Sequence, residues 1–170
     1  SFDFGFFNGK KIKNIDKKII KIDYSNGNAI YINKKFFGEK KVFDEEIFLQ
    51  FDDTELCWRL KKMNKDIFMI TDAKVKHLQG KSHKKQYDFE LKKEVWWHNG
   101  WSHIYLGKKY YSKTKFLKLV LHKVFKSLFM SIACLFFIRI KSSQLHYLNF
   151  KGTLNSLMNK KSSYRSKINF

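Results

Sequence analysis

Two adjacent carboxylates, Asp52 and Asp53, stand immediately before an apolar pattern that is typical of a helix. Leu56, Leu60 and Met63 recur at helical spacing after them, which predicts a helix that begins near Asp53. The partial positive charge at a helix start favours an ionised carboxylate, and an ionised carboxylate can accept the proton of a substrate hydroxyl. The same position also suits a carboxylate that only caps the helix. Both interpretations of Asp53 stay open here, and the two roles are compatible.

Further groups of residues lie before and after this acidic pair. An Asn-Gly turn and a Phe-Asp-Glu triplet precede it, and a helical Arg and a stretch that ends in His follow it. These residues are Asn26-Gly27-Asn28-Ala29, Phe43-Asp44-Glu45, Phe48, Phe51 to Leu60, Asp72 to His77 and Gly80-Lys81-Ser82. Taken in order, they resemble the second half of the catalytic domain of glycosyltransferase family 2, the inverting sugar transferases of GT-A fold. The resemblance covers Asp3 to Tyr111, and Trp97-His98, Trp101-Ser102 and Lys108-Lys109 look like the following region of bacterial rhamnosyltransferase-like members.

The resemblance implies a role for several of these residues. Asp53 matches the general base, which takes the proton of the acceptor hydroxyl as that hydroxyl attacks the sugar. Asp52, Asp44, Gly27 and Asn28 match positions on the substrate side of the site. Asp44 can instead cap a turn, and Gly27 and Asn28 can simply form one. The implied substrates are a nucleotide-sugar donor and a saccharide or lipid-linked acceptor, as in the synthesis of a bacterial surface glycan.

His77 is the residue for which the resemblance implies metal binding. In some members a histidine at this point joins the ligands of a divalent ion, Mg²⁺ or Mn²⁺, which stabilises the leaving diphosphate. Ala73, Val75 and His77 alternate with lysines, so a strand would place His77 on the apolar side. A histidine buried in the core fits the same pattern. Glu55 and Arg59, four residues apart, are expected to form an ion pair on the helix surface.

The expected fold is α/β: part of a GT-A (Rossmann-like) domain with a mixed sheet over residues 1–112, then a basic helical extension over 113–170. The predicted elements are a turn at 26–27, a strand at 29–32, a helical turn at 34–37 that ends at Gly38, a helix from 53, strands at 67–70 and 73–77, a helix from 87 and a helix over 116–140.

Family members begin with a nucleotide-binding half that carries an Asp-x-Asp motif, which this chain lacks. Because the chain opens at Ser1 with a cluster of aromatic residues, we expect a fragment that is inactive alone.

Charge is distributed unevenly over the 170 residues. Lys and Arg number 35 against 15 Asp and Glu, and the net charge is +20. Every acidic residue lies between Asp3 and Glu94, whereas 14 basic residues follow Val95. Such a block predicts an anionic partner, either a phospholipid surface or a nucleic acid. A solvated, lysine-rich helical surface explains part of the excess.

An apolar segment inside the basic block favours lipid over nucleic acid. Residues Ser127 to Ile138 carry no charge, but 12 residues are too few to span a bilayer, which needs about 20. We therefore expect an interfacial helix on the cytoplasmic face of an anionic membrane, with a buried core helix as the alternative. Two rivals to the enzyme hypothesis stay open: a non-enzymatic membrane-surface module and a nucleic-acid-binding protein.

Other classes of site find little support. Two cysteines far apart, Cys57 and Cys134, do not form a disulfide framework, and no P-loop or nucleophile elbow is present. His98 and His103 are five residues apart on a predicted helix, which is poor geometry for one metal ion.

Overall fold

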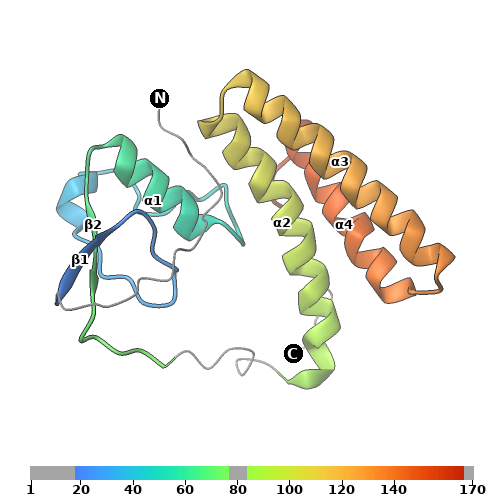
Figure 1. Ribbon diagram of the computed structural model, residues 1–170, viewed down its shortest axis with the longest axis horizontal. Coiled ribbons are helices and arrows are strands. Elements are labelled where there is room, and N and C mark those ends of the chain that lie inside the picture. Colours follow the sequence, from blue (N-terminus) through green and yellow to red (C-terminus); the bar gives the residue numbers. More distant parts are fainter. Residues whose placement is uncertain (1–17, 77–83, 167–170) are drawn as a thin grey trace. The chain divides into compact units, whose positions relative to one another are not determined.

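The computed structural model describes residues 18–76 and 84–166 and is mixed α/β, with most of its regular structure helical (Figure 1). The chain forms two compact units. The first comprises Ser1–Asp44 and Asp52–Gln79, and the second Glu45–Phe51 and Gly80–Phe170. The boundary between these units is not the one expected at residue 112. The helix that follows residue 87 packs with the C-terminal helices and so belongs to the second unit.

The first unit contains β1 (Ile19–Ile22), the 3-10 helix η1 (Lys34–Phe37), α1 (Asp52–Lys62) and β2 (Ile67–Ile70). Strands β1 and β2 pair antiparallel, with Ile19 opposite Ile70 and Ile22 opposite Ile67. Acidic residues in the first turn of α1 and basic residues in its last turn complement the helix dipole. The predicted turn at 26–27, the helical turn before Gly38, the helix after Asp52 and the strand at 67–70 are all confirmed.

The strands predicted at 29–32 and 73–77 are wrong over their described residues, which are irregular. Strand β2 pairs with Ile19–Ile22 instead, so among the described residues no strand pairs with the 29–32 segment, and Tyr31 is 98% exposed. The sheet of the described residues is a two-stranded antiparallel one, not the mixed sheet that we expected.

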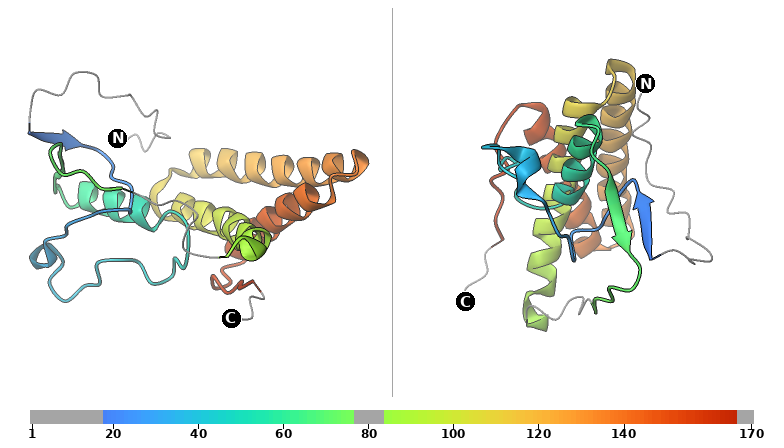
Figure 2. Two further views of the ribbon diagram at one scale, coloured as in Figure 1. Left: turned by 90° about the horizontal axis from the view of Figure 1, so that it is seen from below. Right: turned by 90° about the vertical axis from the view of Figure 1, so that its left-hand side faces the viewer.

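The second unit is built mainly from α2 (Asp88–Tyr110), α3 (Lys113–Phe136) and α4 (Ile140–Leu157), preceded by the short 3-10 helix η2 (Lys85–Tyr87). The three long helices lie side by side in Figures 1 and 2 and pack pairwise. Ser112 caps α3 by accepting a hydrogen bond from the Lys115 N–H. The helix expected from residue 87 is thus present, and the helix expected over 116–140 ends at Phe136. The helical extension expected over 113–170 includes α4, for which no separate bounds were predicted.

Two glycines set the closest approach of α2 and α4. A Cβ atom on Gly100 would lie 2.1 Å from the carbonyl oxygen of Asn149, and one on Gly152 would lie 2.0 Å from that of Trp97. Real Cβ atoms do not come this close to backbone oxygens, so each glycine is needed because the opposing helix occupies the place of its side chain. Asn149 adds a hydrogen bond from its amide to the Trp96 carbonyl, at 2.9 Å.

Polar side chains of α2 form hydrogen bonds with the two irregular segments of this unit, one before α2 and one after α4. The His98 ring is buried, with Nε2 2.9 Å from the Tyr164 carbonyl and Nδ1 2.9 Å from Ser162 Oγ. A carbonyl only accepts, so Nε2 carries the proton and Nδ1 accepts from the serine. The Trp101 indole donates to the Lys160 carbonyl and Ser102 to the Leu49 carbonyl. His98 is a structural residue of this unit.

Candidate functional site

Four hydrogen bonds converge on the carboxylate of Asp53, in the first turn of α1. Its Oδ2 accepts from the Tyr24 hydroxyl at 2.9 Å and from the Gly27 N–H at 3.1 Å. Its Oδ1 accepts from the N–H and the hydroxyl of Thr54, at 2.6 and 3.2 Å. A carboxylate offers about four lone-pair positions, so these donors occupy all of them. The side chain itself is half-buried.

The segment that contains Tyr24 and Gly27 runs antiparallel to α1 and contacts it at every second residue. Asp23 pairs with Lys61 at 2.9 Å, Ser25 exchanges long hydrogen bonds with the Cys57 thiol, and Gly27 donates to Asp53. Two residues of extended chain advance about 6.6 Å and four residues of helix about 6 Å, so the two repeats stay in step. This match places the Asn-Gly turn beside the start of α1.

Burial changes the titration of two groups beside Asp53. Burial first, then the hydrogen bond and charge of Asp53, raise the pKa of Tyr24 to about 12, because an ionised phenol would face the carboxylate. Burial also raises the pKa of the Cys57 thiol. At neutral pH Tyr24 therefore stays protonated and donates its hydrogen bond.

The other residues implied on the substrate side lie at different distances from this cluster. Asn28 is exposed in the turn next to Gly27, and Asp52 is exposed at the first position of α1. Asp44 is half-buried and follows a segment whose Lys41 and Val42 carbonyls accept hydrogen bonds from the Arg59 guanidinium. The structure thus joins Gly27 to Asp53 by a hydrogen bond. It brings Asp44 into the same unit only indirectly, because Arg59 of α1 binds the carbonyl groups of the segment just before Asp44.

Arg59 also forms the predicted ion pair with Glu55, at 3.0 Å. Glu55 is fully buried, so the pair lies in the interior and not on the helix surface. Arg59 lies over the Phe37 ring as well, 5.4 Å from its centre. Its role is to hold loop, helix and 3-10 turn together.

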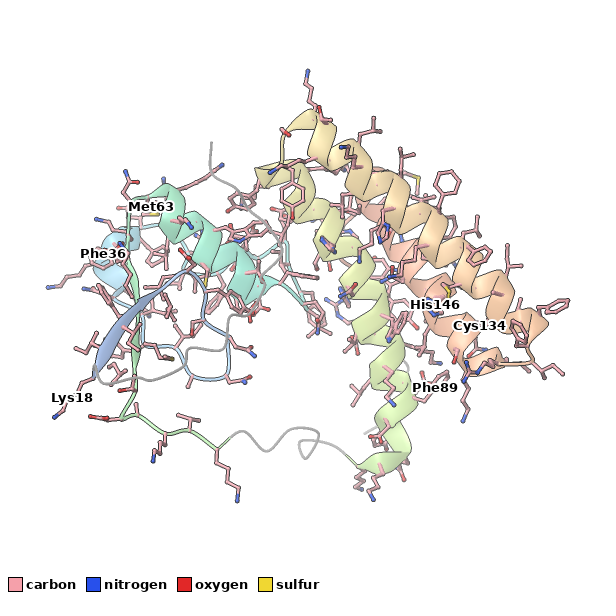
Figure 3. All side chains as sticks on the ribbon, viewed as in Figure 1. Lys18, Phe36, Met63, Phe89, Cys134 and His146 are labelled. Carbon is pink, nitrogen blue, oxygen red and sulfur yellow. The ribbon has the colours of Figure 1, made fainter. Side chains whose placement is uncertain are left out.

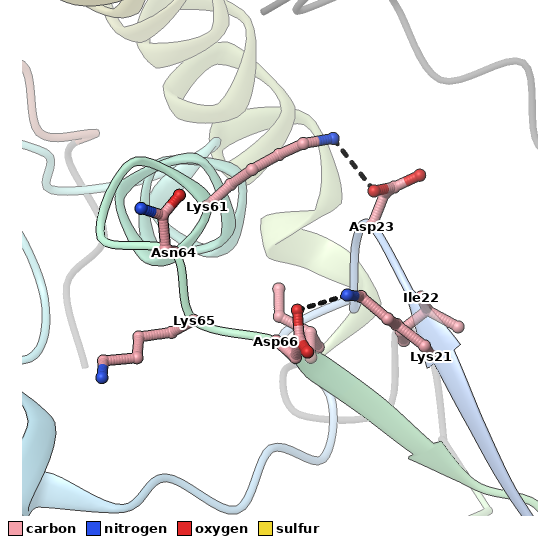
Figure 4. A pocket seen from close by; sticks show the side chains of 8 residues that line it. Lys21, Ile22, Asp23, Lys61, Asn64, Lys65 and Asp66 are labelled. Carbon is pink, nitrogen blue, oxygen red and sulfur yellow. Dashed lines mark hydrogen bonds and ion pairs between the residues drawn. The ribbon is translucent and has the colours of Figure 1, made fainter.

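A cavity of about 290 Å³ lies at the opposite end of α1 from Asp53 (Figure 4). It is lined by Lys21 to Asp23 of the β1 region, by Lys61, Asn64 and Lys65 after the helix, and by Asp66 and Ile67. Two ion pairs, Lys21 with Asp66 and Lys61 with Asp23, lie in its wall, and Lys65 leaves the lining with one more cation than anions. The helix of 11 residues separates this cavity from Asp53 by about 15 Å.

His77, the implied metal ligand, lies outside the described residues. Within the described ranges, no group of three or more His, Cys, Asp or Glu residues is arranged to hold a metal ion. The divalent ion thus stays a prediction.

Comparisons of the chain with models of protein families, with characterised proteins and with solved structures found no match.

Tyr24 and Thr54 are the members of the Asp53 cluster that the sequence analysis missed. Thr54 follows the acidic pair directly, so its contact with Asp53 could have been inferred from the helix start. Tyr24 gave no signal, because its contact depends on how residues 23–27 lie along α1.

Proposed function

We propose that this chain is the acceptor-side part of an inverting glycosyltransferase, with Asp53 as the base that takes the proton of the acceptor hydroxyl. The observation that carries the proposal is the contact between Gly27 and Asp53. The resemblance relies on an Asn-Gly turn and an acidic pair that lie 26 residues apart in the sequence. A shared site requires these two motifs to be neighbours, and the hydrogen bond is consistent with that requirement.

The donors around Asp53 divide into fixed and replaceable ones. The backbone N–H groups of Gly27 and Thr54 cannot leave without moving the turn or the helix, so they hold the carboxylate in place. The Tyr24 hydroxyl is on a side chain that can rotate away. In the proposal, the acceptor hydroxyl takes the position of the Tyr24 hydroxyl on Oδ2 and then loses its proton to that oxygen. Proton transfer requires a heavy-atom separation of about 2.6–3.2 Å, which the present 2.9 Å contact already provides.

The substrates follow from the proposed class: a nucleotide-activated sugar as donor and a surface-glycan or lipid-linked saccharide as acceptor. The proposal concerns the proton transfer at Asp53, and no step of it depends on the divalent ion.

The proposal can be tested in cells without knowledge of the sugar. The gene is replaced by its full-length form carrying Asp53→Asn, and the surface glycan is compared with that of a deletion strain. We expect the same truncated glycan in both. The control is Asp66→Asn, which removes an exposed carboxylate at the other end of α1 and its surface ion pair with Lys21. A complete glycan in the Asp53→Asn strain, at normal protein level, would overturn the proposal.

A further inference from the structure

The outer side of α3, turned away from α2 and α4, carries large apolar side chains along its length. Phe125, Phe129, Ile132 and Phe136 are 67%, 69%, 60% and 83% exposed and recur every three or four residues, so they share one face. Figure 3 shows that apolar side chains, aromatic rings among them, project from the outer side of α3. Together with Leu117 and Leu121, also exposed, they form what we call the apolar stripe.

The inner side of the same helix is small and polar. Ser127, Ser131 and Cys134 are its buried residues over this half. Ser131 and Ser143 of α4 bond reciprocally, with the Ser143 hydroxyl 2.8 Å from the Ser131 carbonyl and the Ser131 hydroxyl 3.2 Å from the Ser143 carbonyl. A pair of helices in water buries its large apolar residues, whereas helices in lipid pack through small and polar ones. This half of the α3–α4 pair has the second arrangement.

Cations run beside the apolar stripe. Lys118 and Lys126 are exposed on the flank of the stripe, and the exposed His122 lies between them at intervals of four residues. No acidic residue occurs after Glu94 to neutralise them. Nucleic acid would need the cations at the centre of the contact, with phosphates against them. Here the centre is apolar and the cations lie at its edge, which fits a bilayer with anionic headgroups.

We propose that the apolar stripe of α3 is a docking surface for an anionic lipid bilayer, with the helix lying in the membrane plane. The stripe from Leu117 to Phe136 is about 29 Å long and enters the boundary between headgroups and acyl chains. The lysines reach the lipid phosphates. Among the described helices, α3 is the one long and apolar enough to cross a membrane. Crossing would place Lys123 and Lys126, in the middle of α3, near the centre of the bilayer, where a cation is strongly disfavoured, so the flat orientation is favoured.

Vesicle co-sedimentation tests the surface without any sugar substrate, so its outcome is independent of the proposed enzyme activity. The intact chain should bind phosphatidylcholine vesicles that contain phosphatidylglycerol more tightly than pure phosphatidylcholine vesicles. Phe129→Asp and Phe136→Asp should each weaken binding at least about tenfold, because burying a Phe contributes about 1.5–3 kcal/mol. Tyr31→Asp is the matched control, since Tyr31 is an exposed aromatic of the first unit and should leave binding unchanged. Circular dichroism verifies that each variant keeps its helices.

The lysines are tested separately. Lys118→Gln with Lys126→Gln should weaken binding to the anionic vesicles about thirtyfold, from about 1 kcal/mol for each cation, and should change binding to neutral vesicles little. Unaltered vesicle binding by the Phe variants would overturn the proposal. Binding to RNA by a chain that does not bind vesicles would also overturn it. So would a chain that does not bind vesicles but forms a dimer without lipid, if Phe136→Asp dissociates that dimer.

The orientation has its own measurement. Leu117→Cys and Phe125→Cys, each with Cys57→Ser and Cys134→Ser, carry a fluorophore that spin-labelled lipids quench according to depth. A flat helix places both labels at the same depth. A crossing helix would separate them by about 12 Å, and that result would overturn the flat orientation.

Discussion

The Gly27 N–H donates to Oδ2 of Asp53 at 3.1 Å, and this bond links a turn to the first turn of a helix 26 residues later. The bond does not require a glycine at this position. The φ of Gly27 is not in the left-handed region, and a Cβ atom would lie 3.5 Å from the Asp53 Cβ, an ordinary contact. The backbone N–H of this turn, available with any residue but proline, therefore fixes the Asp53 carboxylate.

Tyr24→Phe tests whether the phenol is a replaceable occupant of the carboxylate. We expect the variant to retain most of its transfer activity, because the acceptor hydroxyl takes the same place on Oδ2. Its free energy of unfolding should fall by about 1 kcal/mol, the usual net value of a hydrogen bond. Steady-state kinetics and urea denaturation measure the two effects. A loss of turnover as large as that of Asp53→Asn, in a folded variant, would mean that Tyr24 takes part in the reaction itself.

Gly100→Ala should destabilise the second unit. The added methyl group would meet the Asn149 carbonyl at 2.1 Å, so α2 and α4 must separate. Overpacking costs about 1–3 kcal/mol, and a contact this short with a rigid backbone oxygen belongs at the upper end, above the roughly 1 kcal/mol that Ala gains over Gly in a helix. Gly27→Ala is the control, because its methyl group fits. Thermal denaturation should show a lower Tm for Gly100→Ala alone, and equal Tm values would contradict the helix crossing.

Arg59→Met should destabilise the first unit by about 3–5 kcal/mol, the typical result of leaving a buried charge without its partner. Glu55 is that charge, and Arg59 also binds the Lys41 and Val42 carbonyls. The double variant Glu55→Gln with Arg59→Met should recover part of the loss, since no buried charge is left. Urea denaturation of the wild type, of Arg59→Met, of Glu55→Gln and of the double variant forms the cycle. A double variant that loses as much unfolding free energy as the two single variants together would contradict the coupling between the two side chains.

Stability should fall as the pH drops below about 6.5. Burial lowers the pKa of His98, and burial followed by the charges of Lys123 and His122 lowers that of His103 to about 3. Below 6.5 the unfolded chain binds protons that the folded chain does not, so acid favours unfolding, down to about pH 3 for His103. The urea midpoint at about pH 5.5 should lie below that at about pH 7.5. His103→Phe should reduce this difference, and a wild-type midpoint that is the same at both pH values would contradict the burial of these rings.

Elements with a strong local pattern could be predicted from the sequence. The acidic residues before Leu56 and Leu60 mark the start of α1, and the aromatic and apolar periodicities mark α2 and α3. The strand predicted at 29–32 failed because a strand needs a partner, and β2 pairs with Ile19–Ile22. Sequence patterns do not reveal which of two apolar segments will pair.

The surroundings of Asp53 were only partly predictable for the same reason. Its place at a helix start follows from local sequence, as does the nearby Thr54. The contacts with Tyr24 and Gly27 depend on the antiparallel course of residues 23–27 along α1, which no local pattern specifies. The contact of Gly100 with Asn149 is likewise a property of two helices packed together.

The most direct measurement is the turnover of the Asp53→Asn variant of the full-length protein with its donor and acceptor. The amide keeps the size of the carboxylate, and its single oxygen can accept from the Thr54 N–H or from the Gly27 N–H, which donate to different oxygens of Asp53. The variant therefore loses one of these two hydrogen bonds, about 1 kcal/mol, and cannot take a proton. General-base catalysis contributes about 10²–10⁴-fold, so we predict a loss of that size with the fold and the donor affinity nearly unchanged. Turnover above about a tenth of the wild-type value would contradict the assignment of Asp53 as the base.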